Sequence, residues 1–240
     1  VLEPAEPLPP MTQEDLEFER FQIKAVSAIE EELDRILKTR KQSRIQTIAD
    51  MVIRNYGHLD EKINFYQNLR SLEDYVSRHS LNVAILCAMI THVMNIRREE
   101  QYHTVCAALL HDMGKLKKHE DVYFGAPYSR EDAIRNCETQ EEAYSVIEDA
   151  FATEGPAIRR ICQQAAGKQL DLFPEEGKES RYKMLEGSNV LLVANRYDEI
   201  TAMTLQGTAQ SEVKAAQELL EHPEVYDLSL IHISEPTRPY

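Results

Sequence analysis

The sequence contains no tryptophan, few glycines and far fewer basic than acidic residues. Its 27 Lys and Arg stand against 41 Asp and Glu, which gives a formal net charge of −14. That balance argues against general nucleic-acid binding, because such a surface needs a basic stripe. The longest apolar run, around Val83 to Ile90, falls well short of the roughly 20 residues of a membrane span. The composition therefore predicts a globular protein without a membrane partner.

Cysteine is also scarce, and the four present (Cys87, Cys106, Cys137 and Cys162) show no CxxC spacing. We expect reduced thiols and a cytoplasmic location, because disulfide frameworks and zinc sites use closer and more regular spacings. No segment resembles a secretion signal.

Both ends of the chain carry unusual sequence. The chain begins at Val1, which suggests a fragment that lacks an upstream regulatory domain. Residues 228–238, "LSLIHISEPTR", resemble a translated sequencing adapter, so we interpret 228–240 as a non-native tail.

Strand-like alternation is almost absent, and the periodicity predicts an all-α protein. Residues 1–11 are proline-rich and read as a disordered linker. Residues 12–42 form an amphipathic helix whose apolar stripe, from Phe18 to Ile36, predicts either packing on the following domain or a homodimer. Residues 43–227 form the main helical domain. Within it we expect helices over 43–56, 60–72, 74–95, 99–110 and 189–201.

The stretch "ALLHDMGK" (Ala108–Lys115) ends one of these helices with an adjacent His111-Asp112 pair. An imidazole and a carboxylate so placed can contact one ion, or the carboxylate can bridge two, and this mixed N/O ligation suits Fe, Mn, Zn, Co or Ni. Lys115 is expected to bind a phosphate oxygen, and Gly114 to let a ligand approach the backbone. An isolated His-Asp pair is weak evidence, since most are polar residues at a helix end. His79, on the apolar face of the preceding helix, strengthens the metal interpretation.

Two segments carry a family resemblance. "YVSRHSLNVAILCAMI" (Tyr75–Ile90), followed by "ALLHDMGK", resembles the HD superfamily of metal-dependent phosphohydrolases, and more narrowly the HD-GYP branch that hydrolyses the bacterial signalling molecule cyclic di-GMP. "LLVANRYDEIT" (Leu191–Thr201) is similar to the segment that supplies the last aspartate of the family. The resemblance implies an HD-superfamily helical bundle preceded by amphipathic helices, and attack on phosphorus by metal-activated water.

Carried over by position, His79, His111 and Asp112 match metal ligands, and Lys115 matches the lysine after the HD pair. Asn195 stands where the family has its last ligand aspartate, and Asp198 matches the second aspartate of that segment. We expect Asp198 to replace the missing carboxylate or to act in catalysis or phosphate binding.

Later parts of the family pattern are missing. No histidine lies between His119 and His222, so three histidines of the HD-GYP centre have no counterpart, one of them near Thr139. We therefore expect one divalent transition-metal ion rather than two or three. Glu73 and Asp74 are candidates for an additional acidic ligand, or for residues that start the helix and favour its dipole.

Three functional hypotheses follow. The first is a metal-dependent phosphohydrolase acting on cyclic di-GMP or another nucleotide phosphate. The second is a catalytically impaired HD-GYP-like signalling module that binds a nucleotide, a cyclic dinucleotide or a partner protein. The third is a structural helical module in which the HD residues are relics.

Overall fold

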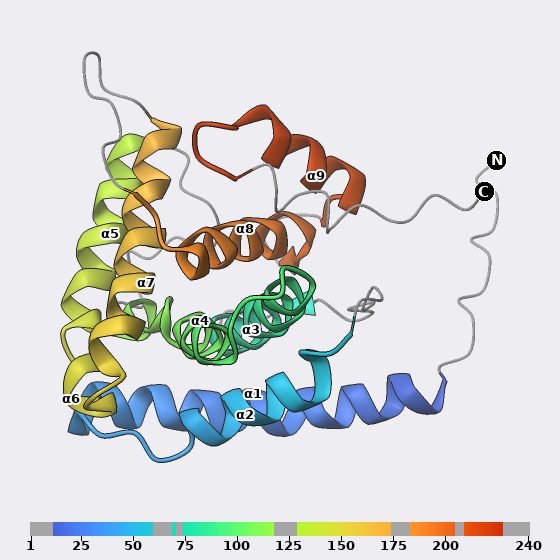
Figure 1. The fold of residues 1–240 in the computed structure, drawn as a ribbon, viewed down its shortest axis with the longest axis vertical. Helices are drawn as coiled ribbons and strands as arrows, with labels where there is room; N and C mark the ends of the chain where they lie inside the picture. Colours follow the sequence, from blue (N-terminus) through green and yellow to red (C-terminus); the bar gives the residue numbers. More distant parts are fainter. Residues whose placement is uncertain are drawn as a thin grey trace.

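The computed structural model describes residues 12–59, 69–70, 74–117, 129–173, 183–204 and 209–227. The expected linker (1–11) and tail (228–240) lie outside these residues. Over the described residues the fold is all-α (Figure 1). The helices are α1 (Gln13–Thr39), α2 (Ile45–Tyr56), α3 (Tyr75–Val93), α4 (Arg98–Leu110), α5 (Arg130–Tyr144), α6 (Ile147–Phe151), α7 (Gly155–Lys168), α8 (Glu186–Thr201) and α9 (Glu212–Glu221), with two 3-10 turns, η1 (Met113–Lys117) and η2 (Gln169–Leu172).

The helix α3 forms the centre of the bundle and packs against α1, α2, α4 and α8. In Figure 1, α3 and α4 lie between the α1–α2 pair and α8, while α5 and α7 close one end. The sequence placed His79 on a single apolar face of the helix expected over 74–95. Instead α3 is buried on several sides, and Val93 at its end is 45% exposed. A helix surrounded by other helices has no solvent face to keep polar, which accounts for its weak amphipathicity.

The long helix α1 packs along α2 and α3 rather than standing alone. Ile29, Leu33 and Ile36 from its apolar stripe are fully buried in the common core. Nearer its start, Phe18 and Phe21 both contact the ring of Tyr56 in α2, at centroid distances of 5.7 and 5.6 Å. This stripe therefore contributes to the core of a single chain, and the homodimer stays a prediction.

The link between α1 and α2 is fixed by a buried carboxylate. The N-terminus of α2 has no capping side chain of its own. Glu32 of α1 instead accepts hydrogen bonds from the amides of Ser43 and Arg44, at 2.6 and 2.7 Å. Glu32 therefore satisfies donors that a helix start otherwise leaves unpaired.

The prediction of a helix over 60–72 is wrong at residues 69–70. Leu69–Arg70 (β1) pairs in parallel with Met203–Thr204 (β2), which follows α8 directly. Residues 60–68 and 71–72 lie outside the described part. Pairing with β2, which follows α8, overrides the local helical pattern at Leu69 and Arg70, since a strand is stabilised by the strand next to it.

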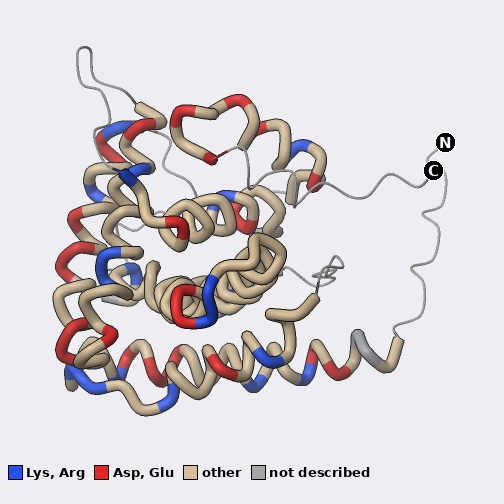
Figure 2. The backbone as a smooth tube through the Cα atoms, viewed as in Figure 1, with Lys and Arg blue, Asp and Glu red and all other residues tan. Residues whose placement is uncertain are grey.

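The other expected helices are confirmed as α2, α3, α4 and α8, within a few residues of their predicted ends. Among the described residues all four cysteines are free thiols, three of them buried. No helix in the described ranges is long and apolar enough to cross a membrane. Figure 2 shows acidic and basic residues interspersed along the helices, with many acidic positions on α5 and α6.

Candidate metal centre

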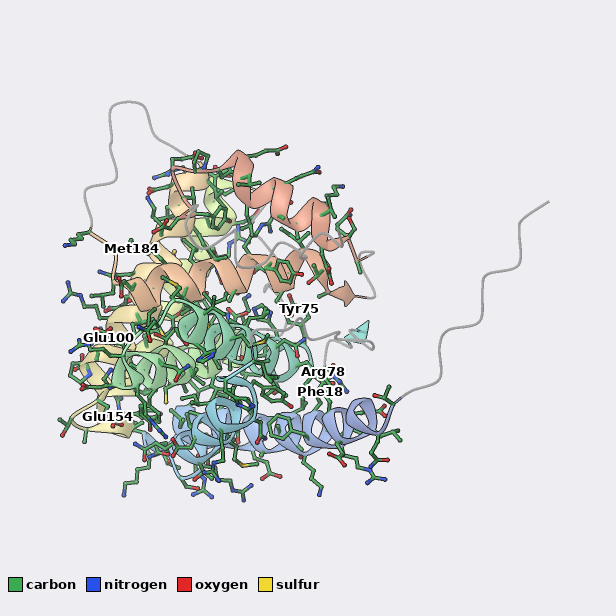
Figure 3. The ribbon with its side chains drawn as sticks, turned by 45° about the vertical axis from the view of Figure 1, so that its right-hand side comes forward. Phe18, Tyr75, Arg78, Glu100, Glu154 and Met184 are labelled. Carbon is green, nitrogen blue, oxygen red and sulfur yellow. The ribbon has the colours of Figure 1, made fainter. Side chains whose placement is uncertain are left out.

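Three helices bring the candidate ligands together at one end of α3. His79 lies one turn into α3, His111 and Asp112 follow the last residue of α4, and Asn195 comes from the middle of α8. Figure 3 marks this end of α3 by Tyr75 and Arg78. The four residues are between 0 and 7% exposed. The all-helical packing thus positions a polar cluster inside the core.

Four ligand atoms converge in this cluster. The Nε2 atoms of His79 and His111 are 3.1 Å apart, and the Oδ1 atom of Asn195 lies 2.8 and 2.9 Å from them. The carboxylate of Asp112 approaches the Nε2 atom of His79 to 3.5 Å. Among the described residues, His79, His111 and Asp112 form the one group of histidine, cysteine and carboxylate side chains that can hold a metal ion.

These separations fit a shared ion. Two donors that each lie about 2.1 Å from an ion, at about 90–110° to one another, are about 3.0–3.4 Å apart. The distances among the two imidazoles and the amide oxygen, and the 3.5 Å between Asp112 and His79, fall close to that range, whereas the Asp112 carboxylate is 3.9 Å from the Nε2 atom of His111. Two nitrogen and two oxygen donors form a ligand set that divalent transition metals accept.

The protonation states also favour a cation. The Nδ1 atom of His111 lies 2.7 Å from the carbonyl oxygen of Ala108, which only accepts, so the imidazole proton is on Nδ1. The Nδ1 atom of His79 similarly donates to the Asp198 carboxylate at 2.6 Å. Both Nε2 atoms therefore present lone pairs to the cluster.

The orientation of Asn195 adds a third lone pair. Its Nδ2 atom donates to Glu199 at 3.2 Å, which leaves Oδ1 facing the two histidines. Turning the amide over would place its oxygen against the Glu199 carboxylate. Three lone pairs thus face one another at about 3 Å, an arrangement that repels without a proton or a metal ion between them.

Asp112 is held on both oxygens by other side chains. Lys115 donates to Oδ2 at 2.7 Å, and Gln140 of α5 donates to Oδ1 at 3.2 Å. Gln140 also accepts a hydrogen bond from the amide of Gly114, at 3.0 Å. Burial by itself would raise the pKa of Asp112, but the charge and the hydrogen bond of the Lys115 ammonium counter it, and the pKa is lowered overall. Asp112 is therefore an anion in this site.

The position of Lys115 differs from the expected one. Its side chain is 2% exposed and ends on Asp112, so the structure supports a role in neutralising that carboxylate rather than in binding phosphate. The space beside Gly114 is likewise filled by α5, since an added Cβ would lie 2.7 Å from the Thr139 carbonyl oxygen and from the Gln140 side chain. Close packing of α5, and not ligand access, requires this glycine.

Asp198 also differs from its expected role. It contacts the Nδ1 atom of His79, on the side of the ring opposite the cluster. Its other oxygen accepts a hydrogen bond from Asn82 at 3.2 Å. In this position Asp198 fixes the tautomer and orientation of His79, as carboxylates behind metal-binding histidines commonly do. The geometry does not place it as a replacement for the missing ligand aspartate.

Glu73 and Asp74 were the candidates for an additional acidic ligand. Asp74 is the N-cap residue of α3 and forms an ion pair with Arg78, one turn along that helix. Of the two alternatives, the helix-start position is the one that the structure shows for Asp74. Glu73 lies outside the described residues.

Burial affects the imidazole as well as the carboxylate. The pKa of His111 is lowered mainly because burial disfavours its charged form, although Asp112 works in the opposite direction. A neutral His111 keeps its Nε2 lone pair available for an ion.

Three supporting residues escaped the sequence reasoning. Gln140 holds Asp112, Glu199 orients Asn195, and the Tyr144 hydroxyl donates to the His111 carbonyl oxygen at 2.5 Å. A signal existed for Gln140, because it adjoins Thr139, near which the family pattern has a histidine. Glu199 lies four residues after Asn195, on the same face of α8.

The family comparison agrees with this geometry. The HD domain family matches residues 76–203, more than half of the chain, and the chain belongs to that family. The matched range contains all four clustered residues, His79, His111, Asp112 and Asn195. Comparisons with curated proteins and with solved structures gave no match.

Proposed function

We propose that this protein is a metal-dependent phosphohydrolase with a single divalent transition-metal ion, held by His79, His111, Asp112 and Asn195. The observation that carries the proposal is the convergence of two imidazole lone pairs and one amide oxygen beside a carboxylate. The ion would supply Lewis acidity and an activated water for attack on phosphorus.

The protein groups have separable roles in this proposal. His79 and His111 supply the neutral donors, and Asp198 keeps the proton of His79 on the far side of its ring. Asp112 supplies the negative charge, and Lys115 and Gln140 hold it in place. A second ion beside Asp112 would have to displace one of these donors, and the Lys115 ammonium would repel it. This supports a single ion.

The proposed substrate class is a nucleotide phosphate ester, with cyclic di-GMP as the first compound to test. The family resemblance motivates this choice. Lys115 is committed to Asp112, so substrate phosphate would be bound by the ion and by groups other than this lysine.

The first experiment combines metal content with turnover. Elemental mass spectrometry of the purified protein should give about one equivalent of transition metal, which His111→Ala removes. His92→Ala is a matched control, because His92 is an exposed histidine on α3, about 20 Å along the helix from His79. Hydrolysis of bis(p-nitrophenyl) phosphate and cyclic di-GMP should depend on the metal in wild type and His92→Ala. A folded, metal-free protein without turnover would refute the proposal.

The second candidate function is a catalytically impaired signalling module. Asn195 favours it, because a neutral amide in place of a carboxylate weakens both ion binding and the charge balance of the site. Stoichiometric metal and nucleotide binding without turnover of either phosphodiester would support this candidate.

A further inference from the structure

A chain of hydrogen bonds connects α1 with the metal centre. Gln22 of α1 donates from Nε2 to the Oδ1 atom of Asn82 in α3, at 3.3 Å. Asn82 donates from Nδ2 to one oxygen of Asp198 in α8, at 3.2 Å. The other oxygen of Asp198 accepts from the Nδ1 atom of His79, at 2.6 Å. Four side chains from three helices thus lie in series and end at a candidate ligand.

The direction of each hydrogen bond in this chain is determined by its neighbours. A carboxylate only accepts, so Asp198 requires donors from both His79 and Asn82. Asn82 then presents its amide nitrogen to Asp198 and its oxygen to Gln22. The Gln22 donor stabilises this orientation of Asn82 over the reversed one, in which the Asn82 oxygen would face the Asp198 carboxylate.

Because Asn82 and Asp198 are buried, the orientation of the Asn82 amide depends on its contacts with other side chains. Asn82 is 2% exposed and Asp198 is 1% exposed, so water has little access to replace a lost contact. Gln22 is the first residue of this hydrogen-bond series and is half-buried. It lies on the part of α1 where Phe18 and Phe21 contact Tyr56. Figure 3 shows Phe18 on α1, below the end of α3 marked by Tyr75. The position of Gln22 therefore follows the packing of α1 on α2 and α3.

We propose that Gln22 is a positioning residue through which α1, a helix outside the matched HD range, sets the metal affinity of the site. Gln22 acts on Asn82, Asn82 on Asp198, and Asp198 on the tautomer and orientation of His79. The inference rests on the proposed function in that His79 is taken to hold the ion. It adds that a displacement of α1, by an upstream segment or a partner, changes the affinity of the site for its metal.

The test measures metal affinity in full-length protein. Competition of Co²⁺ or Zn²⁺ with a chromogenic chelator should give a Kd that is about 3–10-fold weaker in Gln22→Leu, less than the about 10–100-fold loss expected for Asp198→Asn. Gln22→Glu retains size but removes the donor, so it should weaken binding at least as much as Gln22→Leu. The visible absorption of bound Co²⁺ should shift in both variants, because it reports ligand geometry.

Gln13→Leu is the matched control, since Gln13 is an exposed glutamine on the same helix whose side chain contacts Glu17. It should leave the Kd and the Co²⁺ spectrum unchanged. A double-mutant cycle adds a second check: in the Asp198→Asn background, Gln22→Leu should lose most of its effect, because both changes act along one chain. Wild-type Kd and spectrum in both folded Gln22 variants would overturn the proposal.

A measurement on metal-free protein separates this inference from the proposed function. Long-range ¹H–¹⁵N spectra of the histidine rings report which nitrogen carries the proton. The Nδ1–H form of His79 should dominate in wild type and in Gln13→Leu, and lose population in Gln22→Leu and Gln22→Glu. If wild type binds no metal, the proposed function fails, and an unchanged tautomer in the Gln22 variants refutes the positioning role by itself.

Discussion

Replacing Asn195 by aspartate should strengthen metal binding. Asn195 is 4% exposed, and its oxygen already lies 2.8–2.9 Å from both histidine Nε2 atoms, so a carboxylate can occupy the same position. At about 3 Å, with an effective dielectric constant of about 20, a unit charge attracts a dication by about 11 kcal/mol.

Two costs oppose this gain, because in the metal-free protein burial and Glu199 favour the protonated form of the new carboxyl, which has to ionise when the metal binds. Burying the new carboxylate costs about 4 kcal/mol, in the range of several kcal/mol per buried ion. Glu199 now accepts a hydrogen bond from Asn195 at 3.2 Å, and two carboxylates at that separation repel by about 5 kcal/mol on the same dielectric scale. The remainder, about 2 kcal/mol, corresponds to roughly 30-fold tighter binding.

The structure also indicates how to enlarge the effect. Adding Glu199→Gln removes the repulsion and gives the new aspartate an amide donor, so the double variant should bind metal more tightly than Asn195→Asp alone. Asn189→Asp, on the same helix but outside the cluster, controls for the added charge. The assay is chelator competition at constant pH and ionic strength. Unchanged or weaker affinity in both the single and the double variant would refute the assignment of Asn195 as a ligand.

Three further predictions concern stability. Glu32→Gln should lower the free energy of unfolding by about 1.5–3 kcal/mol, since Glu32 accepts charge-assisted hydrogen bonds from the amides of Ser43 and Arg44. Burial alone would raise the pKa of Glu32, but these amides lower it below 4.5. The stability that the Glu32 carboxylate contributes is therefore present above pH 4.5 and is lost as the pH falls through the lower folded-state pKa. The free energies of unfolding from urea titrations at pH 7 and pH 3 should differ less in Glu32→Gln than in wild type. Gly114→Ala should cost about 1–3 kcal/mol by the same assay, because its Cβ would overlap the Thr139 carbonyl oxygen; wild-type stability would contradict the tight approach of α5. Metal at 100 times its Kd should stabilise wild type by about 2.7 kcal/mol in thermal melts, and an equal shift in His111→Ala would place the ion elsewhere.

Much of the site was predictable from local sequence. The local sequence pattern predicted five of the nine helices of the described residues, α1, α2, α3, α4 and α8, because a helical period is visible within a short window where one face is apolar. His79 and the His111-Asp112 pair were identified by residue type and spacing, since a ligand has to be a particular residue type to bind a metal. Asn195 was identified only by the family resemblance. Each candidate ligand can therefore be recognised from the sequence around it.

What each polar group contacts was decided by the tertiary structure. Asp198 and Asn195 lie three residues apart on α8, yet one faces the Nδ1 atom of His79 and the other faces Nε2. That difference depends on how α8 is rotated against α3, more than 100 residues away in sequence, and local sequence does not specify it. Packing of α5 likewise placed Gln140 on Asp112, and the end of α8 turned Leu69–Arg70 into a strand. Residue type and position thus identify the residues that can bind a metal. Which of their atoms face it follows from the tertiary structure, because only packing fixes the relative rotation of distant helices.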